Sequence, residues 1–437
     1  MSNRKLVGKS LTSFVLMTLG FLNSIIFANT FSPQELGTLQ LLITIASFLS
    51  VIITFGAGTV ILKNPGAGRD ISGLYLYLLI RSLKIFTVLI FFLFILVFIG
   101  IVEYEKLYTL VIILIYSLIQ SIYSIEESNY LIQEKLSVSE LIKSSPKRLV
   151  PLLVLCVMII TSSDEITLYL EYLVSILFLL WVTLIRKNIN LRIEISKSTR
   201  REIYLLSRSL IFVSMFSMLF MWGDTFIIST FLPMSDLAYY NMAYTIGSVV
   251  KIVSVIAFSG VAISRVSQSN DINKYKDVAC LSSRISMSIS IIILVLGALV
   301  YNVVLPIEYM PTIGVMYIIT LGMALSSLLG PVYAIVVHTN KIKKYNKIIF
   351  SMVVFNMIFN YILVNKFGIF GVALITSVGE FLLTMSVLLL CRDSFDVLFY
   401  SVKKNALQIV LFLMASFSII FFRIGESLSF YIKGTFL

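Results

Sequence analysis

Three ionisable residues lie deep inside apolar stretches of the sequence: Asp224, Lys251 and Glu380. A charge inside a membrane helix is costly, so such residues pair with one another or mark the path of a substrate or an ion. Lys251 is therefore a candidate for attracting an anionic substrate such as a diphosphate. Asp224 and Glu380 are candidates for its counter-ion, or for a site that takes a coupling proton or sodium ion. The alternative is a structural ion-pair cluster whose charges only neutralise each other.

Basic residues also lie within apolar stretches nearer to the cytoplasmic side. Arg81 and Lys84 lie in one such stretch, and Arg284 holds a similar place in the second half of the chain. Such side chains would form a basic ring at the inner mouth of a cavity. Long basic side chains also reach the interface along an apolar helix, and this snorkelling is the alternative, favoured for Arg284. We count Arg81 and Lys84 with Lys251 as substrate-binding candidates.

Only membrane helices can position these side chains. The chain of 437 residues is 59% hydrophobic and 13% charged, with a mean hydropathy of +1.00. A soluble domain of that composition would have an apolar surface. Apolar runs of about 20 residues recur along the chain, which is the length that crosses a bilayer core. We predict an all-α polytopic membrane protein.

The apolar runs predict about 13 transmembrane helices, within a range of 12 to 14. The predicted helices span residues 11–31, 36–62, 74–102, 107–130, 149–163, 166–185, 203–232, 237–263, 283–305, 311–337, 346–365, 368–391 and 406–423. With the N-terminus in the cytoplasm, 29 of the 34 Lys and Arg residues fall in cytoplasmic segments. That bias follows the positive-inside rule, so the net charge of +12 reflects membrane topology and not nucleic-acid binding.

An internal repeat relates the two halves of the chain. At an offset of 201 positions, residues 23–47 align without a gap with residues 224–248. In this register Asn23 takes the place of Asp224, so the position is polar in both halves, and we place Asn23 with the substrate-binding candidates. Two copies in the same orientation predict two six-helix lobes related by an axis along the membrane normal, an arrangement typical of transporters.

The repeat predicts four parts of the chain. Residues 1–185 form an N-terminal lobe, 186–202 a basic cytoplasmic linker, 203–391 a C-terminal lobe, and 392–437 a connector, an extra helix and an outer tail. The linker's charges fit an anchor near anionic lipid, and it lacks the Gly-rich loop of a nucleotide site. One His and three Cys predict neither a metal site nor a disulfide framework.

Three stretches resemble polysaccharide transporters of the multidrug/oligosaccharidyl-lipid/polysaccharide superfamily. They are FSPQELGTLQLLITIASFLSVIITFGAGTVILK (31–63), WGDTFIISTFLPMSDLAYYNMA (222–243) and NYILVNKFGIFGVALITSVGEFL (360–382). Their order matches the family's, and the resemblance is to O-antigen and other repeat-unit flippases of the Wzx type. The extra helix after residue 391 departs from the family pattern.

The resemblance implies a V-shaped alternating-access transporter in the bacterial inner membrane. Its substrate would be an undecaprenyl-diphosphate-linked oligosaccharide, destined for O-antigen, capsule or exopolysaccharide, and carried from the cytoplasmic to the outer leaflet. Membrane lipid, a polysaccharide polymerase and a chain-length regulator are the implied partners. No cofactor is expected beyond a coupling H+ or Na+.

Two other functions compete with this interpretation. A cation-coupled multidrug or metabolite antiporter of the same superfamily would have a cavity dominated by acids, which Lys251 argues against. A membrane polymerase or ligase acting on the same sugars would need a sizeable outer loop with catalytic residues. The predicted outer loops are all short, so we do not expect an enzyme.

Overall fold

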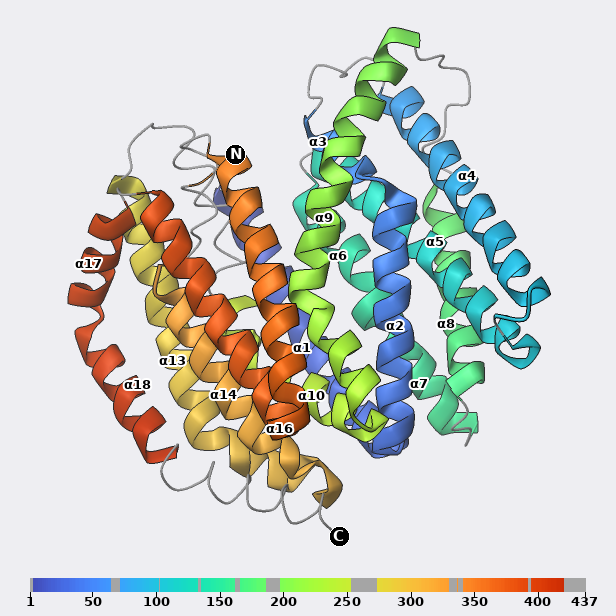
Figure 1. Ribbon diagram of the computed structural model, residues 1–437. Helices are drawn as coiled ribbons and strands as arrows, with labels where there is room; N and C mark the ends of the chain where they lie inside the picture. The colour runs from blue at the N-terminus through green and yellow to red at the C-terminus, as the bar shows by residue number, and fades with distance from the viewer. Residues whose placement is uncertain are drawn as a thin grey trace. The chain divides into compact units, whose positions relative to one another are not determined.

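The computed structural model describes residues 3–63, 71–101, 103–132, 135–161, 166–185, 197–252, 273–329, 336, 341–391 and 394–419 (Figure 1). Nearly all of these residues lie in helices, and none of them forms a strand. The prediction of an all-α protein is confirmed. The predicted outer tail, and the parts of predicted helices at 253–263 and 330–335, lie outside the described residues.

The first part of the chain forms helices α1 to α8. Their bounds are α1 (Asn3–Thr30), α2 (Pro33–Thr54), α3 (Ala57–Lys63), α4 (Ile71–Phe98), α5 (Tyr104–Ile132), α6 (Leu136–Ser144), η2 (Ser145–Leu149), α7 (Val150–Thr161) and α8 (Ile166–Ile185). The predicted helix 36–62 is thus broken in two. The break lies at Phe55 and Gly56, which both have positive φ, 49° and 71°.

The second part begins with the longest unbroken described helix, α9 (Lys197–Phe231). It continues with α10 (Met234–Gly247), α11 (Val249–Lys251), α13 (Asn273–Val304), η4 (Ile307–Tyr309), α14 (Pro311–Ser326), η5 (Ser327–Leu329), α16 (Ile342–Leu390), α17 (Ser394–Lys404) and α18 (Ala406–Ile419). The helix expected from residue 203 starts inside the predicted linker, at Lys197. A bend of 80° separates α17 from α18.

Helix α16 is two antiparallel helices. Gly368 has non-helical dihedral angles (φ 53°, ψ −140°), which a residue with a side chain adopts only under strain. A Cβ built on Gly379 would lie 2.5 Å from Oδ1 of Asn356, and one on Gly371 would lie 2.8 Å from the carbonyl oxygen of Leu363. Residues before and after Gly368 therefore face each other in pairs, as predicted for the helices 346–365 and 368–391.

The fifth predicted helix starts earlier than the sequence indicated. We expected a short helix over 149–163, but the helical run begins at Leu136 and continues through a π turn at 145–149 into α7. Proline lacks an N–H donor and clashes with the preceding turn of a regular α-helix. The wider π turn accommodates Pro146, so Lys143, Lys147 and Arg148 lie on this helical run, and their position on the cytoplasmic side stays a prediction.

Two helix boundaries in the first half of the chain recur 201 residues later in the second half. Helix α1 ends at Thr30 and α9 at Phe231, and α2 begins at Pro33 and α10 at Met234, so both pairs of positions are 201 residues apart. This spacing equals the offset of the predicted repeat. It is consistent with the repeat, which itself stays a prediction.

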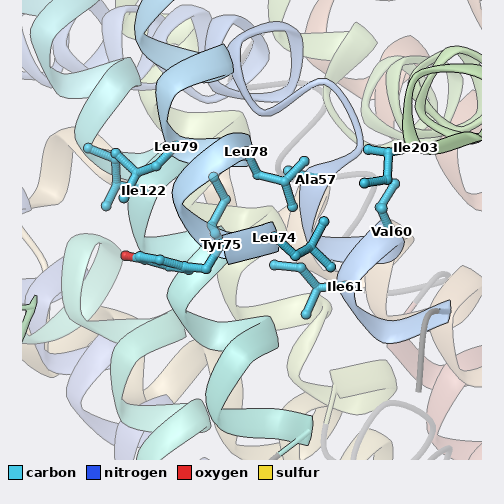
Figure 2. Packing of buried hydrophobic residues seen from close by; sticks show 10 residues of the cluster. Ala57, Val60, Ile61, Leu74, Tyr75, Leu78, Leu79, Ile122 and Ile203 are labelled. Atoms are coloured by element: carbon cyan, nitrogen blue, oxygen red, sulfur yellow. The ribbon is translucent and has the colours of Figure 1, made fainter. Parts of the chain in front are cut away.

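The chain divides into two compact units. Unit 1 comprises residues 1–30 and 41–218, and unit 2 comprises 31–40 and 219–437. In unit 1, helices α3, α4 and α5 enclose an apolar cluster that includes Ala57, Leu78 and Ile122 (Figure 2). Figure 2 shows the Tyr75 hydroxyl turned away from Ala57 and Ile61, at the edge of this cluster. That hydroxyl donates a hydrogen bond to the buried carboxylate of Glu126.

Several helices meet the requirements for crossing a membrane. Five described segments are long and apolar enough, and the bent pair of α17 and α18 would make a sixth. One of the five, Lys343–Leu390, has 48 residues and contains the reversal at Gly368. The exact number of spans stays a prediction.

Close packing in unit 2 depends on Gly322 in α14. A Cβ at this position would lie 2.4 Å from Cβ and 2.5 Å from Cα of Ser377 in α16, so the two helices would have to separate. We expect Gly322→Ala to lower the free energy of unfolding by about 1–3 kcal/mol, seen as a lower Tm in detergent. The control is Gly223→Ala, where a Cβ meets nothing within 4 Å. Equal Tm values for the two variants would contradict this account of the packing.

Candidate functional site

The carboxylate of Asp224 is the centre of a buried polar cluster in unit 2. Asp224 is 3% exposed, and three side chains donate hydrogen bonds to it. The hydroxyls of Tyr240 and Thr376 both lie 2.6 Å from Oδ2, and Nδ2 of Asn360 lies 2.7 Å from Oδ1. The two hydroxyl oxygens also lie 2.9 Å from each other. Four residues from three helices thus meet around one carboxylate.

The fold of α16 explains how the cluster forms. Asn360 lies before the reversal at Gly368 and Thr376 after it, so one hairpin supplies two donors to the same carboxylate. Tyr240 is on α10, which follows α9 after a short turn. Asn356 and Asn360 are four residues apart and share one face of their helix, and the bond from Asn360 to Asp224 shows that this face contacts α9.

Lys251 and Glu380 form an ion pair in the same unit. Nζ of Lys251 lies 2.5 Å from Oε2 of Glu380, and the side chains are 29% and 8% exposed. Lys251 is the last residue of the short helix α11, and Glu380 is on the second half of α16. A nearly buried carboxylate thus neutralises a lysine that keeps access to its surroundings. This is the pairing that an ionisable group inside a membrane needs.

The two clusters are neighbours. The charges of Glu380 and Asp224 are close enough to interact, and Tyr244 interacts electrostatically with both carboxylates. The rings of Tyr240 and Tyr244 stack with their centroids 6.3 Å apart. The structure therefore brings together the three intramembrane charges of the sequence, Asp224, Lys251 and Glu380, within unit 2.

Arg81 serves a structural purpose in unit 1. Its guanidinium donates to the carbonyl oxygens of Thr54 (3.3 Å) and Phe55 (3.1 Å) and to Oγ of Ser207 (2.9 Å). It also lies over the Phe55 ring, 5.2 Å from the centroid. These carbonyls lack helical partners because α2 ends there. Lys84, one turn further along α4, is exposed. Arg81 and Lys84 belong to unit 1 and Lys251 to unit 2, and the role of Arg81 and Lys84 in substrate binding stays a prediction.

Asn23 is buried in unit 1, at the position that Asp224 occupies in the repeat. It is 4% exposed, and its Nδ2 donates a 2.6 Å hydrogen bond to the carbonyl oxygen of Arg148. Arg284 is exposed, and its Nε donates to Oδ1 of Asn405 at 3.1 Å. Asn23 thus contacts backbone where Asp224 contacts side chains, and its role as a substrate ligand stays a prediction.

Comparison with protein families identifies the chain. A model of a family described as polysaccharide biosynthesis protein matches residues 26–314, which is more than half of the sequence. The chain belongs to this family. The matched range contains the resembling stretches 31–63 and 222–243 and the residues Asp224 and Lys251.

Solved structures of flippases and transporters share the family member's fold. The lipid II flippase MurJ, in an inward closed conformation, superposes with a TM-score of 0.72 at 16% identity, covering 95% of this chain and 98% of MurJ. A transporter of the MOP superfamily from Pyrococcus furiosus, described by a reversed polarity of its binding pocket, gives 0.62 at 13% identity, with 90% and 96% covered. An inward-facing MATE multidrug transporter gives 0.59 at 13% identity, with 89% and 98% covered. No curated protein sequence matches the chain.

Sequence reasoning missed three contributors to the sites of this family member. Tyr240 and Thr376 are common residue types in apolar helices, and nothing in their spacing indicated that both bind Asp224. The fifth predicted helix began at residue 149, so Arg148 fell just outside it, whereas the structure places Arg148 in the π turn of the helical run. The aligned polar position at Asn23 and Asp224 was the available signal, since both residues contact helices that contain these missed positions.

The contacts of Arg81 predict a larger stability effect than those of Lys84. We expect Arg81→Ala to lower the free energy of unfolding by about 1–3 kcal/mol, because it leaves the carbonyls of Thr54 and Phe55 without donors. Lys84→Ala is the matched control on the same helix and should stay within about 0.5 kcal/mol. Thermal unfolding of both purified variants in one detergent measures the difference. A stable Arg81→Ala variant that loses transport would instead assign Arg81 to the substrate.

Proposed function

We propose that the protein is a flippase. It carries undecaprenyl-diphosphate-linked oligosaccharide repeat units from the inner to the outer leaflet of the bacterial inner membrane by alternating access, with its N-terminus in the cytoplasm. Membership in a polysaccharide biosynthesis family supports a glycan substrate. A fold shared with a lipid II flippase supports movement of a lipid-linked head group. A polymerase and a chain-length regulator would receive the exported unit.

The ion pair of Lys251 and Glu380 carries this proposal. A lipid-linked substrate can leave its tail in the bilayer, so only the diphosphate and the sugars need a polar path. Lys251 offers a positive charge inside the apolar helices and keeps accessible surface while bound to Glu380. A diphosphate carries more negative charge than a single carboxylate and can compete for the ammonium group. Glu380 would then hold Lys251 in place whenever substrate is absent.

We further propose that Asp224 takes the coupling ion, H+ or Na+. Its carboxylate is surrounded by the oxygens of Tyr240 and Thr376 and by the amide of Asn360. Oxygen donors of this kind suit a hard cation, and protonation of the carboxylate is the other way to neutralise it. Oδ1 of Asn356 and Oδ1 of Asn360 are buried and have no hydrogen-bond partner among the described residues. The Asn360 oxygen belongs to a side chain that already contacts Asp224 and is a further oxygen available to a cation.

A second candidate function is cation-coupled antiport of small molecules. The specific observation in its favour is the pair of interacting acids, Asp224 and Glu380, in one unit. An antiporter would use both acids to bind cations and would have no use for an anion-binding lysine. The two functions therefore differ in their requirement for Lys251.

The flippase proposal is tested by the leaflet in which lipid-linked repeat units reside. In a deletion strain, we expect units on undecaprenyl diphosphate to accumulate on the cytoplasmic side, shielded from an impermeant sugar-modifying reagent. Expression of the protein should restore their exposure. Single units that reach the outer leaflet without the protein, but fail to lengthen, would place it in the polymerising machinery. Exposure that is unaffected by the protein would favour the antiporter.

Two variants of the ion pair separate stability from transport. Lys251→Met leaves the Glu380 carboxylate buried without a partner, which we expect to cost about 3–5 kcal/mol. The double variant Lys251→Met/Glu380→Leu removes both charges and should recover most of that stability. If Lys251 binds substrate, the double variant stays inactive in the leaflet assay although it is stable. An active double variant would reduce the pair to a structural role.

Substitution of Asp224 tests the coupling role. Asp224→Asn keeps the size of the side chain and removes its charge, so we expect transport that no longer responds to an imposed H+ or Na+ gradient. The protein reconstituted in liposomes, with the gradient varied across the membrane, gives the measurement. Tyr240→Phe is the control, because it removes one hydrogen bond at a cost of about 1 kcal/mol and keeps the carboxylate. Gradient-dependent transport by Asp224→Asn would exclude Asp224 as the coupling site.

A further inference from the structure

The π turn between α6 and α7 presents two adjacent cations, Lys147 and Arg148, inside unit 1. The turn is defined by the backbone N–H of Val150, which bonds to the carbonyl of Ser145, five residues earlier. It contains Pro146, which has no N–H to donate. Single π turns inside α-helices are rare and occur often at functional sites. The π turn at residues 145–149 marks a local departure from regular α-helix geometry.

Side chains from two other helices hold this turn in place. Tyr116 on α5 donates its hydroxyl to the carbonyl of Pro146 at 3.0 Å, and Asn23 on α1 donates to the carbonyl of Arg148 at 2.6 Å. Both donors are buried. The Val150 N–H that would bond to the Pro146 carbonyl in an α-helix bonds to Ser145 instead, and Tyr116 supplies the Pro146 carbonyl with a donor. The backbone at Lys147 and Arg148 is therefore fixed relative to α1 and α5.

The cations of the turn lack a carboxylate partner. The described ion pair of this region joins Lys143 to Glu127 at 3.5 Å, and neither Lys147 nor Arg148 has a described carboxylate oxygen within 4.0 Å. Arg148 interacts with Glu140 only at longer range, as Lys147 does with Glu127. The guanidinium also has no hydrogen-bond partner among the described residues. Two adjacent positive charges are left to be neutralised by something else.

Helix α1 leaves room for the arginine side chain. A Cβ on Gly20 would lie 3.3 Å from Nε and 3.4 Å from Cδ of Arg148, so the side chain lies flat against the glycine. The guanidinium is thereby carried across the face of α1, held at Gly20 by its stem and at Asn23 by its backbone. Arg148 is half-buried and Lys147 is exposed. This is a pre-positioned fork, whose planar donors match the oxygens of a phosphate.

We propose that Arg148 and Lys147 bind a phosphate or diphosphate group within unit 1. The inference rests on the proposed function, which supplies an anionic head group inside the membrane. It adds a binding site that is independent of Lys251, on the other compact unit. The head group would bind bidentately to the guanidinium, and the ammonium group of Lys147 would add charge.

The test measures binding of undecaprenyl diphosphate to the full-length protein in phosphatidylcholine nanodiscs. We expect Arg148→Gln to weaken the affinity about tenfold or more, the loss that follows from removing charge-assisted hydrogen bonds. It should also flatten the dependence of affinity on ionic strength, because a charge contact is lost. Lys143→Gln is the matched control on the same helix, since its ammonium group is paired, and should stay within about twofold. Arg148→Lys keeps the charge and should bind more tightly than Arg148→Gln.

Competing ligands distinguish the source of the phosphate. Inorganic pyrophosphate that displaces the lipid from wild type but not from Arg148→Gln would identify a site for the diphosphate itself. Displacement by phosphatidylglycerol alone would assign the turn to bilayer lipid and overturn the proposal. Wild-type affinity and salt dependence in Arg148→Gln would overturn it as well, while leaving the flippase proposal intact.

Two further outcomes complete the test. A wild-type protein that binds undecaprenyl diphosphate no better than undecaprenol would reject the proposed function together with this site. If Arg148→Gln does not give a monodisperse protein, Lys147→Gln and Arg148→Lys decide by the same measurement. Unchanged affinity and unchanged salt dependence in both of these would overturn the proposal.

Discussion

Polar groups inside a bilayer have no water to bond with, and this constraint explains the contacts between helices in both units. In unit 2, three side chains satisfy the carboxylate of Asp224. In unit 1, Arg81 satisfies the carbonyls freed where α2 breaks, and Asn23 and Tyr116 satisfy those freed by the π turn. The break after α2 and the π turn before α7 are both paired with a group from another helix. The polar residues therefore specify which helices meet, in a protein whose apolar surfaces are interchangeable.

The aligned positions Asn23 and Asp224 illustrate how one arrangement supports two chemistries. Both are buried a few residues before the end of a long helix, and both bind a helix that contributes to the same unit. Asn23 is neutral and holds a backbone carbonyl, whereas Asp224 carries a titratable carboxylate and accepts three hydrogen bonds. The neutral position can only fix a neighbour. The charged position can also change its state, which is why the coupling role is proposed for unit 2.

The sequence predicted the class of fold and most helices, because hydropathy and length determine where a chain can cross a membrane. It also identified Asp224, Lys251 and Glu380, since charges stand out in apolar segments. It did not predict the donors around Asp224, because Thr376 meets it only through a hairpin that reverses at Gly368, and Tyr240 only through the turn between α9 and α10. It also began the fifth helix at residue 149, whereas the helical run begins at Leu136. A proline normally ends a helix, and whether a π turn accommodates it depends on tertiary donors that a local pattern does not contain.

The basic residues inside the apolar helices differ most in what already neutralises them. Arg81 donates hydrogen bonds to the backbone carbonyls of Thr54 and Phe55. A substrate that bound the guanidinium instead would leave these carbonyls, at the break after α2, without donors. Lys251 has a carboxylate partner, which the proposed substrate would have to displace and which would bind the lysine again after release. Competition from Glu380 would lower the affinity of Lys251 for a substrate. A transporter benefits from this, because a head group that is bound too tightly would not be released. Of these three cations, only Arg148 has no described hydrogen-bond or ion-pair partner, so binding there disrupts nothing. A flippase that used both Lys251 and Arg148 would have two contacts for the head group. At Lys251 the head group competes with Glu380, and at Arg148 it replaces no described partner.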